Sequence, residues 1–157
     1  MADSYVHLDV VSDNTSEFHD LLKKAIKRGL IAIGMTAERH AKEEISRPKP
    51  HADGTTRPNV DTGRLRNSIT FALAGEQANI QQYSWQKGTI SKASAGTAQY
   101  SGTADDAPGV YIGTNVEYAA DVELGGSKSK AYPFLTPAAT EHNDEYKKLM
   151  EESLKNA

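Results

Sequence analysis

A long hydrophobic repeat between residues 18 and 45 constrains the fold of this chain more than any other feature. Apolar side chains recur there every three or four residues, which is the period of an α-helix. The repeat comprises Phe18, Leu21, Leu22, Ala25, Ile26, Leu30, Ile33, Ala37, Ala41 and Ile45. We expect Thr15 or Ser16 to cap the helix, and Arg47 to end it because a residue before proline disfavours helical geometry. About thirty helical residues span about 45 Å, which is longer than the core of a small domain requires. Part of the helix surface is therefore expected to contact another molecule.

Composition limits the size and the chemistry of the protein. A chain of 157 residues has room for one domain, 1–157, with a modest core. Lys and Arg total 18 against 21 Asp and Glu, so the net charge of -3 gives no overall basic excess for nonspecific DNA binding. Cysteine is absent, which excludes disulfides, thiolate metal sites and a cysteine nucleophile. The sequence shows no signal segment and no apolar run of membrane-spanning length, so a soluble, non-secreted protein is expected.

Local patterns outside the long helix predict a mixed α+β fold. Residues 5–11 alternate between polar and apolar side chains, so the segment 1–14 is either an edge strand or an N-terminal arm that pairs with a neighbouring subunit. Residues 68–73 and 79–86 are expected to pair as a hairpin, preceded by a short helical turn that Asp61 or Thr62 caps. We expect the long N-terminal helix and a C-terminal helix to pack on this small antiparallel β-sheet.

Two segments are predicted to be mobile loops. Residues 47–60 include PKPHADGTTRPN, which contains three prolines and a glycine but almost no large apolar side chain. Residues 87–109 are dominated by glycine, serine, threonine and alanine. A loop of that length is either functional or disordered, and in a ring-shaped assembly it could enter the lumen.

The segment 110–138, VYIGTNVEYAADVELGGSKSKAYPFLTPA, contains a dense series of element boundaries. A strand is expected to end near Gly113, and a short helix to end at the glycine pair 125–126. Residues 132–135 form an extended apolar plug, which faces either the core of its own subunit or a neighbour. Thr136 and Pro137 are expected to begin a final helix that continues to about residue 154.

This segment, together with DTGRLRNSI at residues 61–69, resembles a family of small phage proteins. The chain is similar to the neck, tail-completion or head-tail joining proteins of long-tailed bacteriophages, the gene-product-ten-like tail components of lambdoid phages. That family has, in order, DTGRLRNSI, VGTNVEYAxxVEFGT and ARPFLxPA elements and a charged terminal helix, and all four are present here. The chain departs from it with Leu-Gly-Gly at 124–126 in place of Phe-Gly-Thr, and with Ala-Tyr at 131–132 in place of Ala-Arg.

The resemblance implies a structural virion protein of the neck or tail, assembled in the host cytoplasm, with no catalytic role, cofactor or metal. It implies a homo-oligomeric ring, most plausibly of six subunits, that joins the head connector to the tail tube. The expected partners are connector or head-closure proteins and tail terminator or tail-tube proteins, with passing contact with DNA in the lumen and none with membranes. A tail terminator protein is the nearest alternative. Residues expected to close the fold or to contact neighbouring subunits are Arg64, Arg66, Tyr118, Glu123, Tyr132 and Phe134.

A DNA-binding or nuclease module is the alternative from another functional class. Arg57, Arg64 and Arg66 are the best candidate phosphate ligands, although they could equally pair with carboxylates across an interface. A nuclease also needs carboxylates that converge on Mg²⁺, whereas Glu117 and Asp121 are spaced as an exposed like-charge pair. The five histidines include no pair at the three- or four-residue spacing of a zinc site, and no nucleophile elbow or phosphate-binding loop is present.

Overall fold

The computed structural model of the chain confirms the α+β class and describes most of the sequence. The described residues are 13–51, 53–58, 63–74, 78–86, 89–98, 108–127 and 130–156. The elements are α1 (Thr15–Ser46), β1 (Pro48–Pro50), β2 (Thr56–Pro58), α2 (Arg64–Ser68), β3 (Thr70–Leu73), β4 (Ala78–Gln86), β5 (Thr89–Ala98), β6 (Val110–Gly113), α3 (Ala119–Leu124), α4 (Leu135–Thr140) and α5 (Asn143–Lys155). The predicted strand or arm at residues 5–11 lies outside the described residues. None of the helices in the described part of the chain has the length and apolar character of a membrane span.

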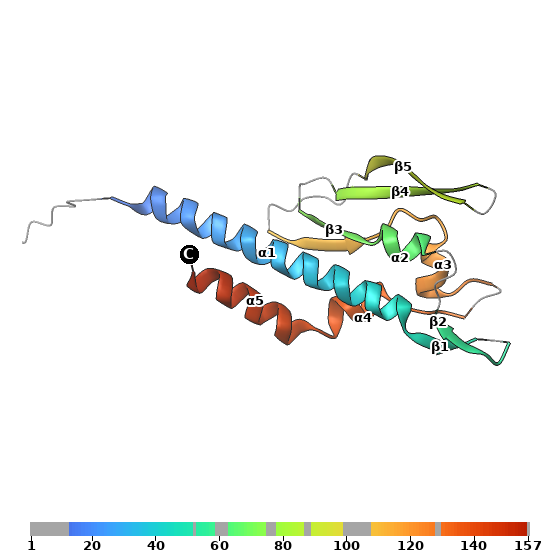
Figure 1. Ribbon diagram of the computed structural model, residues 1–157. Coiled ribbons are helices and arrows are strands. Elements are labelled where there is room, and N and C mark those ends of the chain that lie inside the picture. The colour runs from blue at the N-terminus through green and yellow to red at the C-terminus, as the bar shows by residue number, and fades with distance from the viewer. Residues whose placement is uncertain are drawn as a thin grey trace, which may run out of the picture.

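Helix α1 runs between α5 on one side and β3 and α2 on the other, and its 32 residues confirm the long helical repeat (Figure 1). Its N-cap is Asn14 rather than Thr15 or Ser16, and the carboxylate of Asp13 accepts hydrogen bonds from both the N–H and the hydroxyl of Thr15. Arg47 ends the helix in an extended conformation, as expected of a residue before proline.

Helix α5 packs along α1 and not directly on a sheet (Figure 1). Small residues on α1 permit this close approach, because Ala25 is fully buried and Gly29 faces Met150 and Ser153 of α5. The hydroxyl of Ser153 donates to the carbonyl of Ala25 at 2.6 Å, and the guanidinium of Arg28 donates to the Ser153 carbonyl at 2.7 Å. Helix α5 is therefore held by polar bonds as well as by packing.

Within the described residues the strands form three two-stranded antiparallel sheets, and their pairing differs from the predicted hairpin. Strand β3 pairs with β6, so that Phe71 lies opposite Ile112 and Leu73 opposite Val110. Strand β4 pairs instead with β5, whose residues fall in the predicted loop 87–109. That loop prediction was wrong for residues 89–98, because a ten-residue strand can form from small polar residues when a neighbouring strand supplies its backbone hydrogen bonds. Residues 87–88 and 99–107 of this loop lie outside the described residues.

The predicted loop 47–60 contains a β-hairpin, which corrects a second expectation. Strands β1 and β2 pair with Lys49 opposite Arg57, and the turn between them includes Gly54 at φ 77°. Prolines are tolerated because a two-stranded ribbon has outward-facing positions where no N–H is needed. The carboxylate of Asp53 accepts hydrogen bonds from the N–H and hydroxyl of Thr55 and from Arg57, and these bonds lower the pKa of Asp53 to about 2.

The predicted final helix is divided in two. Helix α4 begins at Leu135, before the expected Thr136 and Pro137, and ends at Thr140, and α5 begins at Asn143. The hydroxyl of Tyr146 donates back to the carbonyl of Ala138, which links the two helices across the break.

The main hydrophobic core lies where the C-terminal half of α1 meets α2, α3 and α4. Its fully or almost fully buried members come from α1, α2, α3 and α4 and from the residues that flank these helices. They are Ala41, Ile45, Leu65, Ile69, Val116, Ala119, Phe134 and Ala138. The β4–β5 hairpin lies on the other side of β3 and α2 from α1 (Figure 1), so the structure is layered from α5 through α1 and β3–β6 to β4–β5.

Gly34→Ala is expected to destabilise the protein even though alanine favours helices. A Cβ at residue 34 would overlap the ring of Phe71, whose Cγ would be 2.7 Å away. We expect the free energy of unfolding to fall by about 1–3 kcal/mol from overpacking, which exceeds the gain of about 1 kcal/mol in helix propensity. Urea denaturation of the purified variant measures the change.

Gly29→Ala is the matched control on the same helix. Its new Cβ would meet the sulfur of Met150 at 2.7 Å, which a methionine side chain can relieve by moving aside, and the Cβ of Ser153 at 3.2 Å, a tight contact but not an overlap. Its stability should change by less than about 1 kcal/mol. Equal losses in the two variants would show that Phe71 does not restrict residue 34.

Candidate functional site

The two segments that carry the phage-neck resemblance are bonded directly to each other. Gly63 precedes α2 with φ 72°, a left-handed conformation that favours glycine, and it rather than Asp61 or Thr62 is the N-cap residue. Arg64 then donates two hydrogen bonds to the carboxylate of Glu117, at 3.0 and 2.9 Å. Four residues later the hydroxyl of Ser68 is 2.5 Å from that of Thr114.

Glu123 links helix α3 to helix α4. Its carboxylate accepts the backbone N–H groups of Phe134, Leu135 and Thr136 at 2.7–2.9 Å, and the hydroxyl of Thr136 at 2.6 Å. Burial raises the pKa of the Glu123 carboxyl, but these four hydrogen bonds outweigh it and hold the pKa below its usual value. A carboxylate at the start of a helix also interacts favourably with the helix dipole.

The apolar plug is a part of this subunit's own core. Phe134 has no exposed surface and belongs to the core described above. The plug therefore faces the core of its own subunit. Tyr132, half-buried, donates its N–H to the Val122 carbonyl and its hydroxyl to the Pro50 carbonyl. Its ring stacks on His51, so the plug also anchors the β1–β2 hairpin.

The other two predicted interface residues are more exposed. Tyr118 is the N-cap residue of α3 and is 37% exposed, with the guanidinium of Arg64 5.7 Å from its ring centre. Arg66 is exposed and lines a shallow hollow beside α1 that contains both acidic and basic side chains, including Glu38 and Lys42. Arg64, Tyr118, Glu123, Tyr132 and Phe134 therefore all contribute to bonds or packing within one subunit.

The three arginines proposed as phosphate ligands have different surroundings. Arg57 pairs with Asp53 at the tip of the β1–β2 hairpin, and Arg64 pairs with Glu117. Arg66 faces the mixed-charge hollow beside α1. Of the two carboxylates considered as a catalytic pair, Glu117 binds Arg64 and Asp121 is exposed on α3. The geometry thus gives little support to a catalytic pair.

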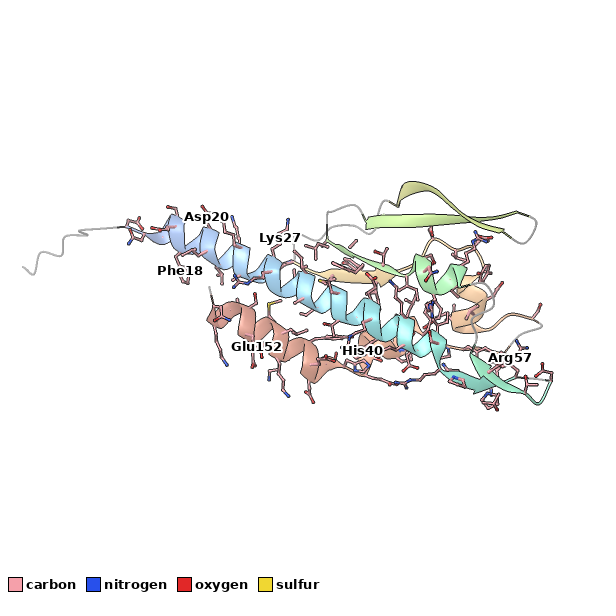
Figure 2. The ribbon with its side chains drawn as sticks, viewed as in Figure 1. Phe18, Asp20, Lys27, His40, Arg57 and Glu152 are labelled. Atoms are coloured by element: carbon pink, nitrogen blue, oxygen red, sulfur yellow. The ribbon has the colours of Figure 1, made fainter. Side chains whose placement is uncertain are left out.

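The N-terminal end of α1 carries an apolar surface that α5 does not cover. Phe18 and Leu21 lie seven and four residues before the buried Ala25, which places all three on one helix face. Phe18 is nevertheless 63% exposed and Leu21 46% exposed. Phe18 lies on the side of α1 along which α5 runs, beyond the end of α5 (Figure 2). We call Phe18 and Leu21 the apolar end of α1.

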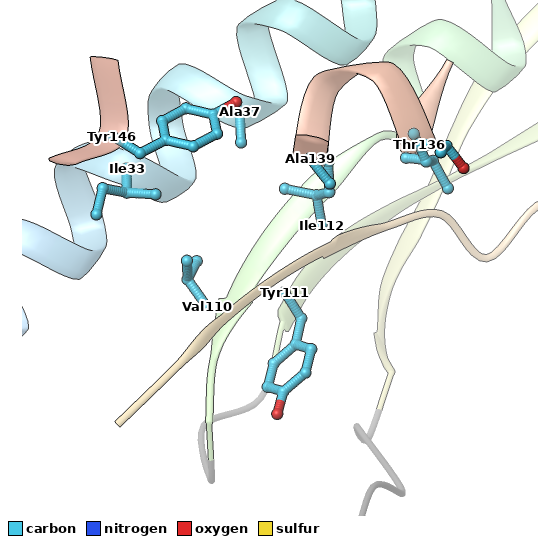
Figure 3. Close-up of a pocket in the computed structure, with 9 residues that line it drawn as sticks. Ile33, Ala37, Val110, Tyr111, Ile112, Thr136, Ala139 and Tyr146 are labelled. Carbon is cyan, nitrogen blue, oxygen red and sulfur yellow. The ribbon is translucent and has the colours of Figure 1, made fainter. Parts of the chain in front are cut away.

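A second apolar feature is a pocket of about 370 Å³ between α1, β6, α4 and α5 (Figure 3). Val110 points into it from β6, whereas Tyr111 points away on the other side of the strand (Figure 3). Its lining is Ile33, Ala37, Val110, Tyr111, Ile112, Leu135, Thr136, Ala139 and Tyr146. Thr136 and Ala139 are exposed, so the pocket opens at the surface, and its apolar walls suit an apolar side chain.

Sequence spacing did not reveal a pair of histidines that the fold brings together. His40 of α1 stacks on His142, which precedes α5, at a ring-centre distance of 3.5 Å. Residues 40 and 142 are far apart in the chain, so a search for i, i+3 or i, i+4 spacing does not find them. The hydrogen bond from His40 holds the pKa of the Glu145 carboxyl below its usual value.

Comparison of the chain with protein-family models, with curated proteins and with solved structures gives no match.

Proposed function

We propose that this chain is a structural virion protein of a long-tailed phage, a ring-forming neck or tail-completion component that joins the head connector to the tail tube. The resemblance of its ordered motifs supports this role. The contacts described above add a physical reason for those motifs to occur together, because Arg64, Ser68 and Glu123 connect the segments that contain them. In this proposal the protein acts by surface complementarity and performs no catalysis.

The observation that carries the ring proposal is a pair of different apolar surfaces on one molecule. The apolar end of α1 presents two exposed apolar side chains. The pocket lined by Val110, Ile112 and Ala139 is a recess elsewhere on the same subunit. A contact between two different surfaces of identical subunits is head-to-tail, and it closes into a ring when the rotation between neighbours divides a full turn. We propose that Phe18 and Leu21 of one copy pack into the pocket of the next. Six copies would match the tail symmetry implied by the resemblance.

The electrostatics favour this assembly role over a DNA-acting role. Arg57 and Arg64 are both paired with carboxylates of the same chain, which reduces the positive charge that they offer to phosphates. DNA retardation at two salt concentrations, with and without Mg²⁺, separates the two functions. The proposal expects no cleavage and no salt-sensitive retardation; cleavage in Mg²⁺ would overturn it.

A joining assay with separated heads and tails tests the proposed contact from both sides. Purified protein should restore infectious particles when it is added to heads and tails that were assembled without it. Phe18→Asp and Ala139→Asp each place a charge in the proposed apolar contact, so each should lower the yield by about tenfold or more. Each variant should unfold at nearly the wild-type temperature, because both positions are exposed in the subunit.

Met35→Asp is the matched control for this assay. Met35 is an exposed apolar residue of α1 that faces the hollow near Arg66, away from the proposed contact. It should join heads to tails as well as the wild type does. Full joining by Phe18→Asp and Ala139→Asp would remove this contact from the proposal.

A further inference from the structure

Two imidazole rings from distant parts of the chain meet between α1 and the start of α5. His40 is almost completely buried on α1, at the position labelled in Figure 2, and His142 is partly buried. The ring planes differ by only 1°. The two rings bring four imidazole nitrogen atoms together between α1 and the start of α5.

One carboxylate oxygen lies close to both rings. Oε2 of Glu145 is 2.7 Å from Nε2 of His40 and 3.9 Å from Nδ1 of His142. One ligand atom from each of the three residues lies within 4.8 Å of the other two. Two imidazoles and one carboxylate form a donor set that zinc and related transition metals prefer in proteins.

Two charged side chains, Glu43 and Arg39, contact the atoms of His40 and Glu145 that face away from the proposed donor set. The other ring nitrogen of His40, Nδ1, is 3.6 Å from Oε2 of Glu43. A ligating histidine commonly directs its second nitrogen to a carboxylate, which orients the ring and increases its basicity. Arg39 binds Oε1 of Glu145 at 3.3 Å and leaves Oε2 directed at the histidines.

We propose that His40, His142 and Glu145 bind a divalent transition-metal ion of the zinc class. An ion with bonds of about 2.1 Å and tetrahedral angles requires ligand atoms about 3.4 Å apart. The ligand atoms now lie within 4.8 Å of one another, so the wider separations have to close by up to about 1.4 Å, whereas the 2.7 Å between Nε2 of His40 and Oε2 of Glu145 has to open slightly. Rotation of the His142 and Glu145 side chains supplies both changes. Water occupies the fourth position, as in sites with three protein ligands.

The proposed ion has a structural role that is independent of the ring. His40 belongs to α1, whereas His142 and Glu145 lie about a hundred residues later, at the start of α5. A bound ion cross-links these two helices at the end opposite the Arg28–Ser153 contact. Because the metal binds only the folded chain, it raises the unfolding temperature.

A zinc titration of the untagged full-length chain tests the site. After treatment with a chelator and dialysis at pH 7.5, the wild type should show a rise in Tm of about 5 °C or more when free Zn²⁺ reaches a hundredfold excess over Kd. Calorimetry should give one ion per chain. His142→Ala and Glu145→Gln should each weaken binding by more than about tenfold, because even the loss of a hydrogen-bond partner behind a ligand costs about 10–100-fold. Co²⁺ should give a visible absorption band in the wild type that both variants lose.

His51→Ala and His19→Ala serve as controls outside the cluster. They remove histidines that the proposal does not use and should leave the zinc response unchanged. The proposal is overturned if Zn²⁺ does not raise the Tm of the wild type. It is also overturned if His142→Ala and Glu145→Gln respond as the wild type does, or if a control variant abolishes the response.

Discussion

Phe134→Ala should cost about 3–5 kcal/mol of the free energy of unfolding, because Phe134 is the largest fully buried side chain in the described part of the chain. The Phe134 ring has no exposed surface and joins α1, α2, α3 and α4 in one core. Its removal leaves a cavity that rigid neighbouring helices can fill only in part. Since small domains are stable by about 5–15 kcal/mol, much of the variant should unfold or fail to accumulate in soluble form. Urea denaturation followed by circular dichroism measures the loss.

Two control variants distinguish the cavity from a general effect of shortening an apolar residue. Phe134→Leu keeps most of the volume and should lose less than Phe134→Ala. Leu124→Ala removes an apolar side chain that is 77% exposed, and its effect should be about 0.5 kcal/mol or less. If Phe134→Ala melts within about two degrees of the wild type, the ring is not a core residue.

Glu123→Ala should cost about 2–3 kcal/mol, the second largest effect. The variant leaves the N–H groups of Phe134, Leu135 and Thr136 without their acceptor, and it separates α3 from the start of α4. Glu123→Gln keeps one acceptor oxygen and should lose less, whereas Asp121→Ala, an exposed acidic residue of the same helix, should lose little. Equal stability of Glu123→Ala and Asp121→Ala would contradict the capping role.

The stabilisation from Glu123 should depend on pH in a defined direction. The pKa of Glu123 is lower in the folded chain than its ordinary value of 4.5, so folding favours the ionised carboxylate. The stabilisation is fully present above the unfolded-state pKa and is lost as the pH falls through the lower folded-state pKa. The difference in unfolding free energy between wild type and Glu123→Gln should therefore be largest near neutral pH and should shrink below about pH 4.5. A difference that stays constant down to about pH 3 would mean that the charge of Glu123 is not involved.

The elements that the sequence predicted correctly are those fixed by local rules. Helix α1 follows from a hydrophobic period maintained over eight turns and from the proline at its end, and both signals are contained in the segment itself. The end of α3 at Gly125 follows from a residue that tolerates positive φ, observed at 82°. Local patterns of this kind do not depend on how distant segments of the chain fold.

The strand pairing was wrong because it depends on distant residues. Adjacent strands often pair, so β3 was matched with β4, but β3 pairs with β6 about forty residues later. The side chains of Phe71 and Ile112 face α1 from neighbouring strands. This packing stabilises the β3–β6 pair only when α1 is in place. The Asp53-Gly54 turn of the β1–β2 hairpin carried a recognisable local signal, which the surrounding prolines concealed.

The candidate site was predicted in part. Sequence reasoning named Arg64, Glu123, Tyr132 and Phe134 as residues that close the fold or contact neighbouring subunits, and in the structure each makes bonds or packing contacts within one subunit. It also indicated that α1 is too long for its own core, which is the signal that leads to Phe18 and Leu21. The pairing of His40 with His142 has no signal in the sequence, because only the antiparallel packing of α1 and α5 brings them together.

Electron microscopy of phage tails assembled without this protein, before and after addition of the purified chain, tests the proposed neck role most directly. We expect the added protein to appear as an extra ring at the head-proximal end of each tail, with sixfold symmetry in averaged end views. The Phe18→Asp variant should leave the tails without this ring. Tails that stay unchanged at saturating concentrations of the folded wild-type protein would contradict its assignment as a neck component.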